Sequence, residues 1–589
     1  MIPWLTKNTL KTATIFLSFF VLSLLYIHPG EIPLLERSLN QMLSSGVDPV
    51  IMPYIFDFFK HTFQHSSADL FYGGVVNPQL DFPYGMVIWD PLLERVQVLL
   101  LSFFLPIEQV GTGLVVLSLF FNAISMYWLA SKLELPSGLG WSMGIAWAFN
   151  PYTRAAAKVF LGLVGTYHLP LLFIGLLQLR ENTFKSKIIA SILFAIISFM
   201  PHYYIVTLAF SLPLIITFCA INEVHFFKYL GRVFTCAIPG ILWLIFSLVK
   251  PVPAQYHSIQ AFPNTGQAQG KYHEFLNLFA AQPLDYFAGD IGSGHVDINP
   301  LRAKLSKDIL EQDYPMGHTQ DRAIGIRWVF IIGALIGLLQ LLPSSKAFWK
   351  QQDRKHVVFF FFFGLFYLWM SLPPDWPFDS FGGSYWVYRL IPQVRTPSRA
   401  GLGFNFSLII ISGLLIKNYL ETKAWTKFRK DLGVFLFSII VFFELPPLLQ
   451  DMPLSKVDPN YKDLESLENC GVGVRLPYIS LKYEDLRYLS FLQRMRETDC
   501  RILNSSIHNS LDKKLYQNFS KFNFKKSQFD KLKKFGDCSK LNWIVFGLPV
   551  TQNEAEKICN QLSWEMKNDG VCVNREPHKS PNFNILKCL

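Results

Sequence analysis

The stretch from Ile188 to Asn222 reads IIASILFAIISFMPHYYIVTLAFSLPLIITFCAIN and contains no Asp, Glu, Lys or Arg. A helix that crosses a membrane needs about 20 mostly apolar residues. The two apolar runs, 188–200 and 202–222, therefore predict two membrane helices, which Pro201 and its polar neighbours separate. Because the first run is short, we expect a tilted helix, a broken helix or a hairpin around Pro201.

Apolar runs of the same kind recur on both sides of this stretch and predict an all-α polytopic membrane domain over 1–449. The first runs from about Thr12 to His28, and no small-residue cleavage site follows it, so we interpret it as an uncleaved anchor. We expect about 11 to 13 transmembrane helices in all. The other candidates are 93–107, 111–131, 137–150, 164–179, 233–250, 324–342, 357–372, 400–416 and 432–448.

The composition of the chain agrees with a membrane protein. Of the 589 residues, 51% are hydrophobic and 16% are charged, whereas a soluble domain has about 25% charged residues. The net charge of +11 is typical of cytoplasmic loops and of contact with anionic membrane lipid. No basic, aromatic-interleaved soluble module is present, which excludes nucleic acid as the partner.

Basic residues predict the orientation of the helices, since cytoplasmic loops are enriched in Lys and Arg. The loops 180–187, 343–356 and 417–431 are basic and should be cytoplasmic. Twelve complete crossings would bring the tail after 449 back to the inside, against these charges. We therefore expect one of the segments 93–107, 137–150 or 164–179 to cross incompletely. The outside then holds the tail and the loops 29–91, 251–323 and 373–399.

The tail, 450–589, predicts a separate extracytoplasmic (periplasmic) α/β domain. Strands are expected at 472–478, 541–548, 571–574 and 583–587, and a helix at 553–564. No nucleotide loop or nucleophile motif occurs there, so we expect it to cap or recruit rather than catalyse. Six cysteines in an exported domain favour disulfides, although six free thiols in a cytoplasmic tail are the alternative. These are Cys470, Cys500, Cys538, Cys559, Cys572 and Cys588, whereas Cys219 and Cys236 lie in apolar runs and should be buried.

Carboxylates collect in the first external loop, and Asp48 is the leading catalytic candidate among them. Asp48-Pro49 precedes the run 50–64, whose apolar spacing predicts an amphipathic helix on the membrane surface that contains His61. An N-cap role for Asp48 is the simpler alternative. Charges this close to hydrocarbon are costly unless they are paired or face water. The other acidic candidates are Glu31, Asp90 and Glu94.

Further polar residues gather at predicted outer helix ends. Arg395 and Arg399 are four residues apart at a helix start, where two guanidiniums and the helix dipole favour an anion such as a phosphate. The alternative is that they bind bulk lipid headgroups. His168, His202, Tyr203 and Tyr204 interrupt apolar runs and are possible substrate contacts, or else ordinary interfacial side chains.

The order of these motifs resembles the GT-C superfamily of membrane glycosyltransferases, in particular its bacterial multispanning members. The resemblance begins with Gly46, Asp48, Pro49, Phe58 and His61, although Val47 interrupts the usual Gly-Asp pair and Phe58 replaces a Trp. It extends over nearly the whole chain. The other matching residues are Asn77-Pro78, Pro83, Gly85, Glu94, Phe149-Asn150-Pro151-Tyr152, Leu169-Pro170, His202-Tyr203-Tyr204, Arg395, Pro397, Arg399, Val474-Arg475-Leu476-Pro477 and Asn542-Trp543.

This resemblance implies an inverting transfer of a sugar from a polyprenyl-phosphate carrier to a glycan, lipid or protein acceptor, on the extracytoplasmic face of a bacterial inner membrane. Asp48 would be the general base, and Arg395 and Arg399 would bind the departing phosphate. Some members use a divalent metal ion, and no metal ligand is assigned here. Two alternatives from other classes are a flippase of lipid-linked saccharide and a non-catalytic assembly factor for envelope glycans.

Overall fold

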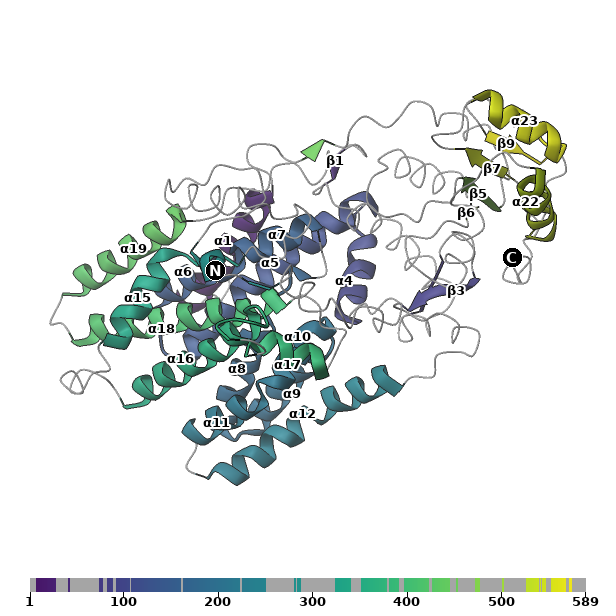
Figure 1. Ribbon diagram of the computed structural model, residues 1–589. Coiled ribbons are helices and arrows are strands. Elements are labelled where there is room, and N and C mark those ends of the chain that lie inside the picture. Colours follow the sequence, from purple (N-terminus) through teal and green to yellow (C-terminus); the bar gives the residue numbers. More distant parts are fainter. Residues whose placement is uncertain are drawn as a thin grey trace.

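The computed structural model describes the membrane part of the chain almost continuously from residue 92 to residue 249, and other parts in shorter segments (Figure 1). All structural statements below refer to these described residues. They are 7–27, 41–42, 74–77, 82–87, 92–105, 107–159, 163–222, 225–249, 280–281, 283–287, 324–339, 351–378, 381–390, 397–422, 426–444, 452–453, 472–476, 501–502, 526–539, 541, 543–546, 552–567 and 571–574.

The described part is mostly helical, and every apolar run identified in the sequence contains a helix. The helices that match these runs are α1 (Lys7–Ile27), α4 (Leu92–Ser102), α5 (Ile107–Lys132), α6 (Ser137–Ala148), α8 (His168–Gln178), α9 (Phe184–Ser198), α10 (His202–Phe210), α11 (Leu212–Asn222), α12 (Phe226–Val249), α15 (Trp328–Leu339), α16 (Gln351–Ser371), α18 (Gly401–Thr422) and α19 (Lys427–Phe443). Two short helices were not expected, α7 (Pro151–Val159) and α17 (Gly383–Leu390).

Three of the described helices are long and apolar enough to cross a membrane by themselves: Val110–Lys132, Phe226–Ile245 and Pro397–Glu421. Helices α10 and α11 are together long and apolar enough for a fourth crossing, but they are bent by 62° relative to each other. Ser211 lies at this bend, and its hydroxyl donates to the carbonyl of Leu208 at 2.8 Å. The stretch that opened the sequence analysis is thus a straight helix, α9, followed by a broken one. The total of 11 to 13 crossings stays a prediction.

Aromatic rings fill the centre of the helical bundle. The ring of Phe173 on α8 lies 4.9 Å from Phe218, 5.0 Å from Phe360, 5.4 Å from Phe363 and 5.6 Å from Phe406, measured between centroids. These partners belong to α11, α16 and α18, so one phenylalanine joins four helices. Since aromatic pairs of this geometry add about 0.5–1.5 kcal/mol each beyond the area they bury, the cluster fixes the relative positions of the helices that carry the polar groups described below.

At one end of the bundle, which we call the basic end, a lysine is buried in an ion pair. Lys417 is 2% exposed, and its ammonium lies 3.3 and 3.2 Å from the two carboxylate oxygens of Asp353 on α16. It also donates to the carbonyl of Leu133 at 3.1 Å. The expectation that Lys417 opens a polar loop is therefore wrong, because α18 continues to Thr422. The hydropathy of the sequence falls at Lys417, which suggested the end of the helix, but Asp353 neutralises the lysine inside the bundle.

The helices α6 and α8 form a hairpin that leaves the basic end and returns to it. α6 begins just after Leu133, and Gln178 at the end of α8 donates to Glu181, which also pairs with Lys132. With 12 and 11 residues, these helices are about 18 and 16 Å long, against about 30 Å for the hydrocarbon core. Each is therefore too short to cross the core by itself. The expectation that one segment in this region crosses incompletely stays a prediction.

The tip of this hairpin, residues 163–168, is held against the middle of α5. The amide nitrogen of the Asn122 side chain donates to the carbonyl of Val164 at 2.8 Å, and its oxygen accepts from the backbone N–H of Thr166 at 2.7 Å. Asn122 is ten residues before Lys132 on α5, or about 15 Å along the axis. The tip therefore lies about halfway along a membrane-length helix.

In the tail, five short strands form a mixed sheet that lies away from the helical bundle (Figure 1). The strand order is β6–β5–β7–β9–β8; β5 pairs in parallel with β6 and β7, and β9 is antiparallel to β7 and β8. The extent of this sheet as an independent domain from residue 450 stays a prediction. The elements are β5 (Val472–Leu476), β6 (Arg501–Ile502), α22 (Lys526–Ser539), β7 (Trp543–Phe546), α23 (Gln552–Leu562), β8 (Glu565–Lys567) and β9 (Val571–Val573).

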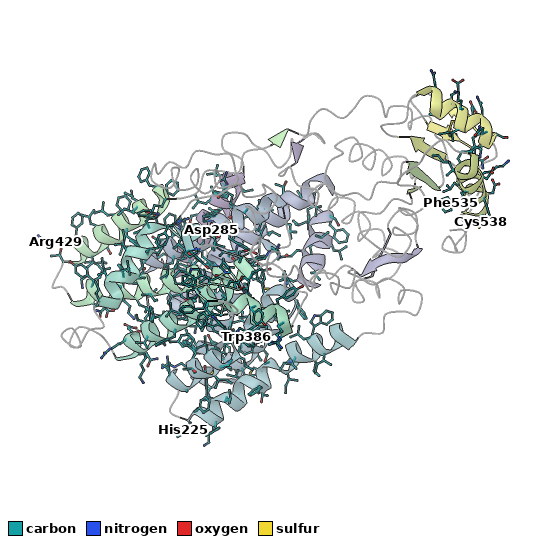
Figure 2. All side chains as sticks on the ribbon, viewed as in Figure 1. His225, Asp285, Trp386, Arg429, Phe535 and Cys538 are labelled. Atoms are coloured by element: carbon teal, nitrogen blue, oxygen red, sulfur yellow. A yellow bond between two sulfur atoms is a disulfide. The ribbon has the colours of Figure 1, made fainter. Side chains whose placement is uncertain are left out.

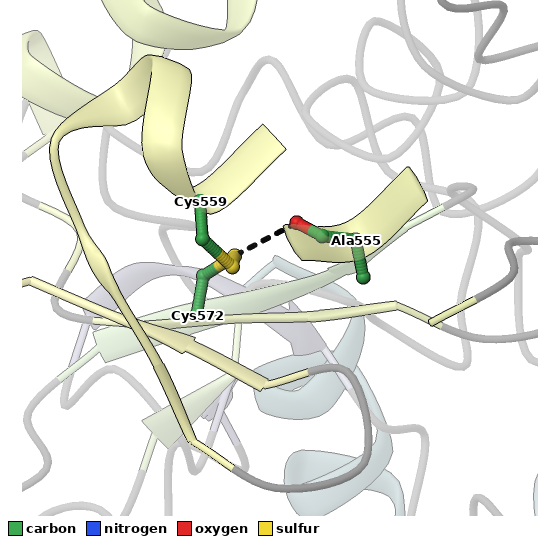
Figure 3. Close-up of a disulfide and its surroundings, with 3 residues drawn as sticks. All are labelled: Ala555, Cys559 and Cys572. Atoms are coloured by element: carbon green, nitrogen blue, oxygen red, sulfur yellow. Dashed lines mark hydrogen bonds between the residues drawn. A yellow bond between two sulfur atoms is a disulfide. The ribbon is translucent and has the colours of Figure 1, made fainter. Parts of the chain in front are cut away.

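A disulfide between Cys559 and Cys572 joins α23 to β9 (Figure 3). Both residues are completely buried, and the sulfur of Cys572 lies 3.9 Å from the carbonyl oxygen of Ala555. Cys538, labelled on α22 in Figure 2, is also disulfide-bonded. Cys219 and Cys236 are free and buried, as their apolar surroundings in the sequence predicted.

Two small antiparallel pairs complete the described structure. β2 (Gly74–Asn77) pairs with β3 (Phe82–Val87), and β1 (Gln41–Met42) pairs with β4 (Met452–Pro453). The second pair joins the first predicted external loop to the start of the tail. The amphipathic helix predicted for 50–64 lies outside the described residues.

Candidate functional site

Two tyrosines and a histidine form a buried cluster beside the hairpin tip. The ring of His168 stacks on Tyr204 of α10 with 4.1 Å between centroids and 14° between planes. The hydroxyl of Tyr204 donates to the carbonyl of Leu163 at 2.6 Å, so the hydroxyl of Tyr152, 3.1 Å away, donates to Tyr204. These three side chains, His168, Tyr152 and Tyr204, are the Tyr–His cluster, and they join α7, α8 and α10.

The local sequence explains why α7 presents Tyr152 at this place. Asn150 is the N-cap of α7: its side-chain oxygen accepts from the backbone N–H of Thr153 at 3.0 Å, and Pro151 follows at the first helical position. The Asn150 amide also donates to the carbonyl of Trp147 at 2.6 Å, which ties the new helix to the end of α6. Arg154, one turn further, is completely buried.

An apolar cavity of about 320 Å³ lies between α15, α16 and α18. Its lining on α16 runs from Phe360 to Leu368 and continues at Leu372, which corresponds to about 18 Å along the helix axis. Leu335 and Leu365 line it and are 56% and 39% exposed. The cavity is therefore long, lined almost wholly by hydrocarbon, and bordered by side chains that reach the outer surface of the bundle.

The end of the cavity that Tyr286 lines is away from the basic end, beside Ser371 at the C-terminus of α16. The Tyr286 hydroxyl bonds to the hydroxyl of Ser371, and its carbonyl accepts from the backbone N–H of Ile326 at 2.9 Å. A Cβ atom at Gly401 would lie 2.5 Å from the Tyr286 hydroxyl, so only glycine fits there. The adjoining residue Asp285 is completely buried and lies among the helices in Figure 2.

Arg399 lies two residues before Gly401, in a 3-10 turn, η8 (Pro397–Ala400), that leads into α18. One of the two predicted phosphate-binding arginines is therefore two residues in sequence from the contact between Gly401 and Tyr286. Arg399 is partly buried. Its turn is 3-10 rather than the α-helical start that the four-residue spacing suggested, and Arg395 lies outside the described residues.

A buried arginine connects the cavity to the Tyr–His cluster. Arg327 follows Ile326, which lines the cavity, and its guanidinium donates to the carbonyl of Phe149 at 3.0 Å. Phe149 in turn precedes Asn150, the cap of the helix that carries Tyr152. Arg327 is 3% exposed. One hydrogen bond thus links the residues beside the cavity to the turn that precedes α7, the helix that carries Tyr152.

The structure brings several of the predicted site residues into this region and leaves others undescribed. His168 and Tyr204 lie in direct contact, and His202 and Tyr203 open the same helix, α10. Glu94 lies in the first turn of α4, where the backbone N–H of Leu93 donates to the carbonyl of Phe199, three residues before α10. The predicted residues outside the described part are Glu31, Asp48, His61, Asp90 and Arg395.

Sequence reasoning did not single out Tyr152 as a site residue, nor Thr166, Tyr286 and Arg327. A signal existed for Tyr152, because it closes the Phe149–Tyr152 motif that contributed to the family resemblance. Arg327 lies near the start of an apolar run, where a charge is costly unless it is paired or faces water. Its position was therefore a signal as well. Nothing in the local sequence marks Tyr286, because its contacts are with residues far along the chain.

Within the described ranges, no group of three His, Cys, Asp or Glu side chains is arranged to hold a metal ion. A divalent ion, which some members of the GT-C superfamily use, is therefore not assigned to any residue here. Its assignment stays a prediction.

No protein-family model matches the sequence, and no curated protein matches it significantly. Among solved structures, the chain is similar to the arabinofuranosyltransferase AftD from Mycobacteria, with 12% identity and a TM-score of 0.52. The match covers 92% of this chain and 35% of AftD, so the chain spans about a third of that enzyme.

A second similarity is to an oligosaccharyltransferase of Archaeoglobus fulgidus, with 9% identity and a TM-score of 0.41, over 92% of this chain and 70% of that one. The same archaeal enzyme, AglB, has been solved with an inhibitory peptide and a dolichol-phosphate, and also with zinc and sulfate. The fold assignment depends on AftD, whose TM-score is higher. The described helices of this chain share their fold with AftD, in agreement with the resemblance of its sequence motifs to the GT-C superfamily.

Proposed function

We propose that this protein is a membrane glycosyltransferase that moves a sugar from a polyprenyl-phosphate carrier to a glycan, lipid or protein acceptor. The single observation that carries this proposal is the long apolar cavity between α15, α16 and α18, which Tyr286 lines at the end where it packs against Gly401, two residues after Arg399. An isoprenoid chain is a long hydrocarbon that ends in a phosphate. A long hydrocarbon-lined cavity matches the isoprenoid chain, and we assign the phosphate to Arg399, which is two residues in sequence from the Tyr286 contact.

The proposed reaction is a displacement at the anomeric carbon of the sugar. A hydroxyl oxygen of the acceptor forms the new bond to this carbon, while the bond from the carbon to the phosphate oxygen breaks and leaves its electron pair on the phosphate. Asp48 is the proposed base that takes the hydroxyl proton, with Glu31, Asp90 and Glu94 as alternatives. Arg395 and Arg399 would stabilise the charge that grows on the departing phosphate.

Two features support the extracytoplasmic face of a bacterial inner membrane as the place of the reaction. The basic end of the bundle carries Lys132 and Lys417, as the cytoplasmic side of a membrane protein does, and the cavity extends toward the other end as far as Tyr286 and Leu372. The Cys559–Cys572 disulfide in the tail fits an oxidising compartment. We assign the tail a capping or recruiting role on that same side.

A flippase of lipid-linked saccharide is the second candidate, and one observation favours it. The break between α10 and α11, together with the polar hairpin tip halfway along α5, resembles the interrupted helices and mid-membrane polar sites of transporters. The fold similarity and the long apolar cavity favour the transferase.

The test is transfer by the full chain in liposomes, from radiolabelled undecaprenyl-phosphate hexoses and pentoses to envelope lipids and glycans. Asp48→Asn should lower the turnover by about 10² or more with little effect on carrier binding, and Arg399→Gln should lower it by about 10². Unchanged transfer in Asp48→Asn would exclude Asp48 as the base, and Glu94→Gln would then be measured in the same assay. Movement of the carrier across the liposome without any transfer would establish the flippase instead.

The cavity is tested separately by filling it. Leu335→Trp places a large ring at the cavity lining and should weaken binding of undecaprenyl phosphate by about tenfold, the loss expected when about two methylene groups are displaced from apolar surroundings. Leu339→Trp is the matched control, because Leu339 lies one turn along the same helix, is 66% exposed, and is not part of the lining. Equal binding by both variants would show that the carrier lies elsewhere.

A further inference from the structure

The hairpin tip holds two buried hydrogen-bonding atoms for which the described part of the chain offers no partner. These are the hydroxyl oxygen of Thr166, whose residue is completely buried, and Nδ1 of His168, whose residue is 2% exposed. The two residues are separated by a single position. Leaving a buried polar atom without a hydrogen bond is costly, so such atoms in a well-packed region call for an explanation.

The positions of both residues are fixed by their surroundings. The His168 ring lies parallel to Tyr204 in a stack, and Tyr204 is fixed by its hydrogen bonds to Leu163 and Tyr152. The backbone of Thr166 is fixed by Asn122 from the middle of α5. The surrounding structure thus holds the His168 ring and the Thr166 backbone in place, which is what a preformed binding site requires.

The depth of the tip limits what its ligand can be. Thr166 lies beside Asn122, about 15 Å along α5 from Lys132 at the basic end, which is about half the thickness of the hydrocarbon core. A ligand that reaches this depth with hydroxyl groups must either be water or be carried there as the headgroup of a lipid. Arg327 links the residues beside the apolar cavity to the turn that precedes α7, the helix that carries Tyr152.

We propose that Thr166 and His168 form a subsite that hydrogen-bonds the sugar hydroxyls of a lipid-linked saccharide. A hydroxyl group is both a donor and an acceptor, so sugar hydroxyls can satisfy the Thr166 hydroxyl and Nδ1 of His168 whichever tautomer the ring adopts. This inference rests on the proposed function for the identity of the lipid. The sugar could belong to the polyprenyl-phosphate donor or to a glycolipid acceptor, and both sources share this chemistry.

The test measures binding rather than transfer, with the full chain in lipid nanodiscs. The probes are undecaprenyl-phosphate glucose, undecaprenyl phosphate without sugar, and a diglucosyl diacylglycerol. Thr166→Val and His168→Phe keep the shape of each side chain and remove its hydrogen-bonding atoms. Each should weaken binding of a sugar-bearing probe by about three- to tenfold, the size of one hydrogen bond, and leave the sugar-free carrier unchanged.

The two sugar-bearing probes distinguish the sources. Weaker binding of undecaprenyl-phosphate glucose alone identifies the donor, and weaker binding of the diglucosyl lipid alone identifies the acceptor. The matched controls are His356→Phe, which removes another buried histidine stacked on a phenylalanine, and Thr217→Val, which removes an exposed hydroxyl. Neither control should change the binding of any probe.

Three outcomes would overturn the proposal. Binding of both sugar-bearing probes could be unchanged in Thr166→Val, which is the isosteric variant that keeps the test valid if His168→Phe does not fold. The sugar-free carrier could lose as much affinity as the sugar-bearing one. A high-resolution map of the undecaprenyl-phosphate glucose complex could show only an ordered water at Thr166 and His168. None of these results depends on transfer, so the failure of the subsite is distinguishable from the failure of the proposed enzyme.

Discussion

The basic end of the helical bundle and the hairpin tip in its middle both bury polar side chains, but the hydrogen bonding of these side chains differs. At the basic end, Lys417 and Asp353 neutralise each other at 3.2 Å, and the lysine also donates to the carbonyl of Leu133. At the hairpin tip, Thr166 and His168 are buried and held in place, yet two of their polar atoms have no hydrogen-bond partner in the described structure. The groups of the first arrangement satisfy each other, whereas the two atoms of the second can still form hydrogen bonds with a ligand.

This difference indicates what each region contributes. A buried ion pair whose members come from α16 and α18 holds two helices together and needs nothing from outside. Polar atoms that are fixed without a partner reduce stability in the empty protein, and such a cost is characteristic of functional sites. Substitutions at the basic end should therefore act mainly on stability, and substitutions at the tip should act mainly on ligand binding.

The largest effect is expected for Lys417→Met. Removing one member of a buried ion pair leaves the other charge, on Asp353, without compensation, which costs about 3–5 kcal/mol. We expect a large fall in the thermal unfolding temperature of the purified protein, measured in detergent by intrinsic fluorescence. The double variant Lys417→Met/Asp353→Leu removes both charges and should recover most of the loss. A single variant as stable as the wild type would show that the pair does not hold the basic end.

An intermediate effect is expected for Tyr204→Phe at the other region. The variant keeps the ring that stacks on His168 but removes the hydroxyl that bonds to Leu163 and Tyr152. Leaving the buried carbonyl of Leu163 without its donor should cost about 1–3 kcal/mol, with a further loss of binding of undecaprenyl-phosphate glucose. Tyr152→Phe removes only one of these bonds and should cost less. Equal stability of Tyr204→Phe and the wild type would contradict the described network.

The smallest effect is expected for Glu181→Gln, which removes the exposed pair with Lys132 at the same basic end. The hydrogen bond from Lys132 holds the pKa of Glu181 below its ordinary value of 4.5. Its contribution is therefore present above about pH 4.5 and is lost as the pH falls through the lowered pKa. Glu181 is 52% exposed, so solvent screening should keep this contribution below about 1 kcal/mol.

Unfolding temperatures of wild type and Glu181→Gln, compared at pH 7 and pH 3, measure this contribution. The small difference at pH 7 should shrink at pH 3. If Glu181→Gln destabilised the protein as much as Lys417→Met, burial would not explain why the Lys417 ion pair contributes more stability than the Lys132 ion pair.

The positions of the helices could be predicted from the sequence because long apolar runs have few structures available to them in a membrane. The runs that begin at 111 and 188 gave α5 and α9 with small errors at their ends. α7 could not be predicted in the same way, because its nine residues include Thr153 and Arg154 and form no apolar run. Lys417 was misplaced because hydropathy does not show that a carboxylate from α16 lies beside it.

The candidate site was predictable in part. His168 and Tyr204 were singled out as polar residues in apolar surroundings, and the structure places them in contact. That contact depends on the packing of α8 against α10, and the bond between Tyr152 and Tyr204 joins residues 52 apart in the chain. No local pattern contains this information. The cavity is likewise a property of three packed helices, and its lining residues resemble any other membrane-facing leucines and phenylalanines.

The hydrogen bonds of Asn122 to the hairpin tip have a consequence for how the chain inserts into the membrane during synthesis. α6 and α8 are each too short to enter a bilayer stably as independent segments, and α7 between them carries Arg154. Since α5 precedes them in the chain, the side chain that receives Val164 and Thr166 is already in place when the hairpin emerges from the ribosome. We therefore expect α5 to be in the membrane first and to bind the hairpin as it inserts. The order of the helices along the chain then contributes to the formation of the site.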